Sequence, residues 1–202
     1  MGTHIRTIDK STGFCVASGD PHYQGFDRKS TYHRYDVGTY IMTTMTEREF
    51  EVQTRLWPCG NGQVTCNCGV AVREDNDIII IDLCHGNHGH TLDYISLKDP
   101  PEDIADGTQV TMTDGSSATD YVMYFPSGSI VTVNVYTRHM NIRIEVPGDD
   151  YRHSYGICGN FDGDETNDFE KPDGTFHTGS DNYPDPFFES WRYESVSQIA
   201  TL

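Results

Sequence analysis

Basic residues are scarce in this sequence of 202 residues, which has 14 Lys and Arg against 31 Asp and Glu and a net charge of −17. A surface that binds the phosphates of nucleic acid needs clustered Lys and Arg, so no nucleic-acid partner is expected. An acidic surface repels anionic membranes and attracts cations or basic proteins. The composition therefore favours calcium or basic proteins as partners.

Long apolar runs and the common enzyme motifs are also missing. The apolar run Ile78–Ile81 is far shorter than the roughly 18 residues that a membrane-spanning helix needs. The chain has no G-x-S-x-G elbow, no H-E-x-x-H helix and no phosphate-binding loop. We therefore expect no membrane span, and we do not expect a conventional enzyme.

What the sequence does contain is the pattern of β-strands. Apolar and polar residues alternate in several short stretches, of which the clearest are 50–56, 66–72, 131–135 and 142–146. Period-two alternation is typical of strands with one buried face, whereas Ile78–Ile81 predicts a strand buried on both faces. The spacing of strands and turns predicts an all-β sandwich. We expect one domain over residues 13–202, and residues 1–12 are interpreted as an expression leader or a flexible N-terminal segment.

Six cysteines, an even number, indicate three disulfides and an oxidising, extracellular compartment. Cys66 and Cys68 would point to the same face of a strand, so each should bond to another element. A hairpin centred on Asn76 would place Cys68 opposite Cys84. The predicted pairs are Cys68–Cys84, Cys59–Cys66 across a short turn, and the distant Cys15–Cys158.

Zinc binding is the alternative, because Cys66-x-Cys68 lies near a group of histidines, namely His85, His88 and His90. Structural zinc usually takes paired cysteines separated by about 2–4 residues, and here that spacing and a second pair are missing. We therefore favour disulfides. The histidines are interpreted as a solvated turn that would sense mild acid, because histidine titrates near a pH of about 6.5.

The strongest local signal is a segment rich in side-chain oxygen atoms, which contains Asn160, Asp162, Asp164, Asn167 and Asp168. Calcium binds about 6–8 such oxygens. An EF-hand is excluded, because its loop needs Gly at the sixth position, where a loop starting at Asn160 has Glu165. Two interpretations remain open. One is a calcium ion that relieves the repulsion between carboxylates, and the other is a loop of Asx turns without an ion.

Two blocks of sequence carry a family pattern. They read C-x-x-x-G-D-P-H-Y-x-x-F-D from Cys15 to Asp27 and Y-G-I-C-G-N-F-D-G from Tyr155 to Gly163. In this order they resemble the von Willebrand factor type D domain, and they bracket most of the chain. The resemblance implies a twisted antiparallel β-sandwich with a calcium-binding loop and with the two blocks adjacent. It also implies the disulfides Cys15–Cys158 and Cys59–Cys66.

The resemblance further implies a structural calcium site that joins the two blocks. Its ligands would be Asp27, the side chains of Asn160, Asp162, Asn167 and Asp168, and the backbone carbonyl of Asp164. Many members of the family carry two more disulfides, one from near Gly38 to the C-terminal tail and one from near Met45 to near Tyr155. Both ends of each are missing here, so no unpaired half remains.

The tetrapeptide Gly19-Asp20-Pro21-His22 is the one place where the sequence suggests chemistry. The Asp20 side chain would attack its own carbonyl carbon, and Pro21 would leave as a secondary amine with His22 as general acid. Some similar domains cleave themselves at this bond in mild acid, and the resulting anhydride can cross-link to an amine. The alternative interpretation is that the tetrapeptide only turns the chain into a strand. Cleavage would be a single-turnover event, not enzyme turnover.

We therefore expect a secreted, calcium-stabilised structural or adhesive module of a larger matrix, mucus or adhesive protein. Its partners would be other extracellular matrix or adhesive proteins, or copies of itself. The alternative is a module that binds a basic growth factor of the bone morphogenetic protein type, which the charge of −17 would attract.

Overall fold

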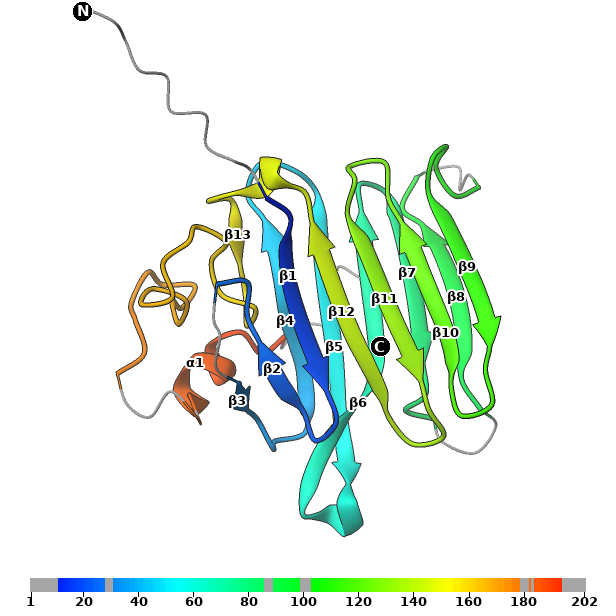
Figure 1. The fold of residues 1–202 in the computed structure, drawn as a ribbon, viewed down its shortest axis with the longest axis horizontal. Helices are drawn as coiled ribbons and strands as arrows, with labels where there is room; N and C mark the ends of the chain where they lie inside the picture. Colours follow the sequence, from blue (N-terminus) through cyan, green and yellow to red (C-terminus); the bar gives the residue numbers. More distant parts are fainter. Residues whose placement is uncertain are drawn as a thin grey trace, which may run out of the picture.

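The computed structural model describes residues 11–27, 31–85, 89–98, 103–178, 182 and 184–193, which form two antiparallel β-sheets (Figure 1). The seven-stranded sheet has the spatial order β3 (Tyr32–His33), β2 (His22–Gln24), β1 (Gly13–Ser18), β12 (Met140–Val146), β11 (Ile130–Val135), β10 (Thr119–Tyr124) and β9 (Gln109–Asp114). The six-stranded sheet has the order β13 (Ser154–Tyr155), β4 (Gly38–Met45), β5 (Phe50–Cys59), β6 (Val64–Glu74), β7 (Asp77–Asp82) and β8 (Thr91–Ser96). The all-β prediction is confirmed.

Helical structure is minor in the part of the chain that the structure describes. It consists of the short 3-10 helices η1 (Gly60–Gly62) and η2 (Gly148–Asp150) and of the α-helix α1 (Asp185–Ser190). Among these residues there is no helix with the length and apolar character that crossing a membrane requires.

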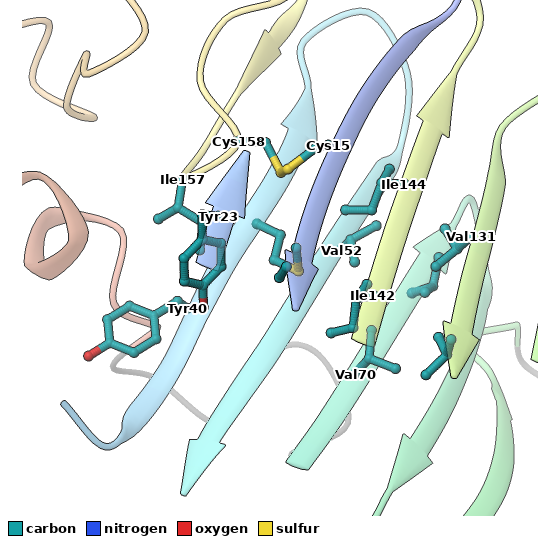
Figure 2. Close-up of a cluster of buried hydrophobic side chains, with 14 of the residues drawn as sticks. Cys15, Tyr23, Tyr40, Val52, Val70, Val131, Ile142, Ile144, Ile157 and Cys158 are labelled. Atoms are coloured by element: carbon teal, nitrogen blue, oxygen red, sulfur yellow. A yellow bond between two sulfur atoms is a disulfide. The ribbon is translucent and has the colours of Figure 1, made fainter. Parts of the chain in front are cut away.

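The core lies between the two sheets, as the alternating pattern predicts. Figure 2 shows Ile142 and Ile144 of β12 beside Val52 of β5 and Val70 of β6, and all four side chains are fully buried. Burying apolar side chains on both inner faces is what stabilises a sandwich of this kind. The main stabilising contacts therefore join segments that are distant in sequence.

Strand β7 confirms the prediction of a strand buried on both faces. Ile79 and Ile81 belong to the main core, whereas Ile78 and Ile80 join a second apolar cluster on the opposite face of the same sheet, against Ile95. Both faces of β7 are therefore covered, and its continuous apolar run is explained.

The N-terminal strand β1 pairs with β12, so that Cys15 lies opposite Ile144. After β13, the chain runs back along β4, where Ile157 N–H donates to the Ile41 carbonyl (3.1 Å) and Cys158 N–H donates to the Met42 carbonyl (2.8 Å). The two sequence blocks are thereby brought to the same end of the sandwich.

Helix α1 covers the edge of the sandwich near β2 and β4. Phe187 and Phe188 are fully buried, and the Phe188 ring lies 5.0 Å from that of Tyr23. Beyond the helix, Arg192 Nη1 donates to the Val37 carbonyl (2.9 Å). Hydrogen bonds and aromatic packing thus join the C-terminal segment to β4.

Candidate functional site

The two sequence blocks meet at the disulfide between Cys15 and Cys158, whose Cα atoms lie 5.7 Å apart. Figure 2 shows this disulfide inside the core. The Phe26 N–H donates to the Cys158 carbonyl at 3.0 Å. Gly25 approaches the same carbonyl so closely that an added Cβ would lie 2.5 Å from its oxygen. Covalent and backbone contacts therefore hold the end of the first block against the second.

Asp27, the last residue of the first block, reaches the acidic loop. Its Oδ2 accepts hydrogen bonds from the backbone N–H groups of Asp162 (2.7 Å) and Gly163 (2.6 Å). On the other side of the loop, the hydroxyl of Tyr151 donates to the carbonyl oxygen of Asp162. The loop is therefore held between two side chains that come from distant parts of the sequence.

Asn167 and Asp168 place further oxygen atoms on the inner side of this loop. Asp168 is 1% exposed, and its carboxylate lies against Gly159. Asn167 Nδ2 donates to Asp162 Oδ2 at 2.9 Å. The Oδ1 atom of Asn167 is buried and accepts no hydrogen bond from the residues that the structure describes. A buried oxygen without a donor costs free energy unless another group, such as a cation, interacts with it.

Asp164 and Asn160 are engaged within the loop itself. Asp164 Oδ1 accepts hydrogen bonds from the N–H (3.0 Å) and hydroxyl (2.6 Å) of Thr166, and these bonds lower the pKa of Asp164. Its side chain therefore forms an Asx turn of the kind expected for an ion-free loop. Asn160 Nδ2 donates to Glu170 Oε2 at 3.0 Å, so this amide is directed toward another acidic side chain.

The donors gathered here are carboxylate and amide oxygens, which are the ligands that calcium prefers. Asp27, Asp162, Asn167 and Asp168 lie around the loop, and the Asp164 carbonyl accepts a hydrogen bond from the Asn167 N–H at 3.4 Å. Over the described residues, no three His, Cys, Asp or Glu side chains form a metal-binding group. The carboxylates of Asp27, Asp162 and Asp168 therefore do not meet as one three-carboxylate group here, and the fit to calcium rests on the types of donor present. The residues fit calcium by their donor chemistry and by the buried Oδ1 of Asn167.

The Gly19-Asp20-Pro21-His22 tetrapeptide forms the turn between β1 and β2. Gly19 has a φ of +66°, and its N–H donates to Asn141 Oδ1 at 3.1 Å. His22 Nδ1 lies 3.1 Å from the carbonyl oxygen of Asp20 and 3.5 Å from its Oδ1. The imidazole therefore lies within hydrogen-bonding distance of the carbonyl group that the proposed cleavage would attack.

A second histidine accompanies His22. His33 lies opposite His22 in the β2–β3 pair, and the two ring centres are 4.4 Å apart. Burial lowers the pKa of His33, and the neighbouring His22 lowers it further. Sequence analysis missed His33 and Asn141 because strand pairing, not a sequence motif, brings them to the tetrapeptide.

The remaining cysteines form the disulfides Cys59–Cys66 and Cys68–Cys84, which are the pairs expected from the sequence. Cys66-x-Cys68 therefore provides no thiolates for zinc. Of the histidines that the structure describes here, His85 Nδ1 contacts the Asp82 carboxylate and His90 Nε2 lies 2.7 Å from the Tyr121 hydroxyl. His88 lies outside the described residues.

Comparison with known proteins gives a consistent result. The family model of the von Willebrand factor type D domain matches residues 15–175. The chain is 32% identical over 185 residues to IgGFc-binding protein from Homo sapiens, an alignment that covers 88% of the chain and 3% of that protein. It is 25% identical over 186 residues to SCO-spondin from Gallus gallus, covering 89% of the chain and 3% of that protein. It is 27% identical over 172 residues to zonadhesin from Sus scrofa, covering 80% of the chain and 6% of that protein.

Proposed function

The chain belongs to the von Willebrand factor type D family, and on that premise we propose that it is a calcium-stabilised structural and adhesive module of a larger secreted matrix, mucus or adhesive protein. The chain spans about 3% of the length of the first curated relatives that it matches, so the rest of such a protein would supply other functions. The observation that carries the proposal is the contact between Asp27 and the loop at Asp162 and Gly163. This contact joins the first sequence block to the second at a cluster of oxygen donors.

Calcium would supply positive charge to a loop in which several carboxylates otherwise repel one another. Asp27, Asn160, Asp162, Asn167 and Asp168 would hold it with their side chains and Asp164 with its carbonyl. Because these residues come from both blocks, an ion that binds only the folded chain would stabilise the fold. Assembly of a long extracellular protein would then depend on calcium, because each module must stay folded to present its surface.

Thermal unfolding in excess calcium and in excess chelator tests this proposal. Calcium at about 100 times its dissociation constant should stabilise the fold by about 2.7 kcal/mol. Asp168→Asn should remove most of this difference. Asp173→Asn is the control, since Asp173 forms a similar exposed turn with Thr175 outside the site. Identical melting curves of the unaltered chain with calcium and with chelator would rule the proposal out.

A second candidate activity is self-cleavage between Asp20 and Pro21, favoured by the position of His22 beside the Asp20 carbonyl. An oxygen of the Asp20 carboxylate would attack the Asp20 carbonyl carbon, forming a C–O bond and a five-membered cyclic anhydride. The C–N bond to Pro21 would break, and the nitrogen would leave as a secondary amine after taking up a proton. Protonated His22 would donate to the carbonyl oxygen and supply that proton. Water or a nearby amine would then open the anhydride.

Mass spectrometry before and after reduction tests this activity on samples kept at pH values of about 5.5 and 7.5, on either side of the ordinary histidine pKa. Residues 1–20 should separate only after reduction, because Cys15–Cys158 holds them. His22→Gln should slow the reaction, whereas His85→Gln, far along the chain, should not. An intact chain after reduction at both pH values would exclude self-cleavage under these conditions.

The acidic surface also bears on the choice of partner. A net charge of −17 favours basic extracellular proteins, among them basic growth factors, over acidic ones. Such binding should weaken steeply with added salt, because exposed charges are screened over about 8 Å at physiological ionic strength. Binding of a basic growth factor that does not respond to salt would argue against this partner class.

A further inference from the structure

A hollow of about 430 Å³ lies between the tip of the β5–β6 hairpin and the turn that joins β11 to β12. Figure 1 shows both turns at the lower end of the sandwich, away from the loops that follow β13. Pockets for small ligands in proteins have volumes of about 300–1,000 Å³, so the hollow is large enough for a single sugar ring. Its lining consists of Trp57, Pro58, Cys59, Gly60, Asn61, Gly62, Cys66, Arg138 and His139.

Trp57 provides the aromatic wall of this hollow. Its Nε1–H donates to the Arg138 carbonyl at 3.1 Å, which fixes the indole and joins the two turns. Deeper in the same region, Asn67 Nδ2 donates to the Met140 carbonyl at 3.3 Å. The Cys59–Cys66 disulfide closes the hairpin on the other side. The walls are therefore held in place before any ligand binds, which lowers the entropy cost of binding.

The charge in the hollow is opposite to that of the chain as a whole. Among the residues that the structure describes, no Asp or Glu lines it, although the sequence contains 31 of them. Arg138 is exposed, and it takes part in no ion pair between residues that the structure describes. His139 stacks on Tyr136 with ring centres 4.5 Å apart, and burial lowers its pKa. Arg138 is thus the one permanent charge among the described lining residues.

We propose that this hollow binds an anionic saccharide, with a sugar ring on the face of Trp57 and its sulfate or carboxylate on the Arg138 guanidinium. The negative face of an indole attracts the partly positive C–H groups on one face of a sugar ring. A guanidinium forms paired hydrogen bonds with oxyanions. Asn61 and His139 provide further polar groups for hydroxyls. This goes beyond the calcium proposal and does not depend on it, because no residue is shared.

The test is a titration of the chain with N-acetylglucosamine 6-sulfate, followed by amide NMR shifts and tryptophan fluorescence. The chain has two tryptophans, and Trp191 is only 7% exposed, so a fluorescence change would report on Trp57. Neutral N-acetylglucosamine, inorganic sulfate and an acetylated acidic dipeptide are the comparison ligands. We expect the sulfated sugar to bind about tenfold more tightly than each of them, with shifts confined to the lining, because stacking and charge pairing act together.

Two variants separate the contributions. Arg138→Gln should weaken binding of the sulfated sugar about tenfold, because it removes the charge-assisted hydrogen bonds. Trp57→Phe should abolish the fluorescence response and weaken both sugars. Arg143→Gln is the matched control, since it removes the same charge from an exposed site on β12 and should leave binding unchanged. Melting curves establish that each variant is folded.

Four results would overturn the proposal. Equal affinity for inorganic sulfate would mean that the hollow recognises charge alone. Equal affinity for the acidic dipeptide would mean that the hollow binds acidic peptides and not saccharides in particular. Shifts outside the lining, or a sulfated-sugar affinity that Arg138→Gln leaves unchanged, would place binding elsewhere.

Discussion

Gly159 and Asp168 are in direct contact, because a Cβ atom added to Gly159 would lie 2.7 Å from Oδ1 of Asp168. Gly159 has a φ of +77°, in the left-handed region that favours glycine. It follows Cys158 immediately, so the chain leaves the buried disulfide and turns sharply over the Asp168 carboxylate. Backbone conformation and close packing thus both require glycine at the position where the acidic loop begins.

Replacing this glycine should disturb both the fold and the loop. Gly159→Ala should destabilise the chain by about 2–5 kcal/mol, the sum of left-handed strain and overpacking against Asp168. Gly174→Ala is the matched control, because Gly174 has the same φ of +77° but nothing within 4 Å of an added Cβ. It should cost only about 1–2 kcal/mol. Urea denaturation measures the free energy of unfolding of both variants. Equal losses would mean that the contact with Asp168 does not contribute to the cost of Gly159→Ala.

A buried ionic network at Asp150, the residue before Tyr151, should be sensitive to single changes. Arg48 forms two hydrogen bonds with Asp150, at 2.9 and 2.7 Å, and one with Glu74 at 3.1 Å. Both acidic partners are buried. Arg48→Ala should therefore cost about 3–5 kcal/mol, because it leaves two buried carboxylates without their cation.

Arg73→Ala is the control for this network. Arg73 pairs with Glu49, whose side chain is 64% exposed, and such surface pairs contribute only about 0–1 kcal/mol. The free energy of unfolding should therefore change little. If Arg48→Ala and Arg73→Ala lost similar stability, the burial of Asp150 and Glu74 would not explain the cost of removing Arg48.

Much of the fold follows from local pattern, and the structure shows why some of it does not. The alternation in the later strands and the apolar run Ile78–Ile81 correctly predicted buried faces, because strand periodicity is visible in the sequence. The short strands β2, β3 and β13 were not predicted. Each has only two or three residues, too few for a period to show, and pairing with distant strands determines them.

The candidate sites likewise combine residues that the sequence predicts with residues that it does not. The acidic loop was visible because its oxygen-bearing residues are close in sequence, and Asp27 was added from the family resemblance. Tyr151 carries no such signal, yet it holds the Asp162 carbonyl. The hollow at Trp57 and Arg138 was also missed, because its two turns are far apart in sequence and meet only when the sheets pack. Contacts across the sandwich are what sequence patterns do not reveal.

The disulfides should contribute according to the length of chain that each closes. Cys15–Cys158 spans 143 residues and Cys59–Cys66 spans seven. Loop-closure entropy predicts that replacing the first pair by alanine costs about 5 kcal/mol, and the second about 2 kcal/mol. The comparison of the two double variants by denaturation at one calcium concentration checks this. A larger loss from the short hairpin would show that local packing, not chain entropy, dominates.

His33, beside the Asp20–Pro21 bond, should make stability depend on pH. His33 has a pKa lowered from 6.5 chiefly by burial and then by His22, while Asp20 opposes the shift. The folded chain therefore binds a proton at His33 less readily than the unfolded chain does. Stability is unaffected above a pH of about 6.5, falls as the pH drops through that value, and is fully reduced below the lowered pKa.

His33→Phe keeps an aromatic ring beside His22 and Tyr35 but removes the titrating group. The slope of unfolding free energy against pH should then be shallower between pH values of about 6.5 and 5, although His139, also lowered by burial, keeps part of it. At a pH of about 8 the slopes of the two chains should agree, since neither histidine is protonated there in either state. Parallel curves over the whole range would mean that His33 takes up its proton equally in the folded and unfolded chains. In that case, any loss of stability in acid would have to come from groups other than His33.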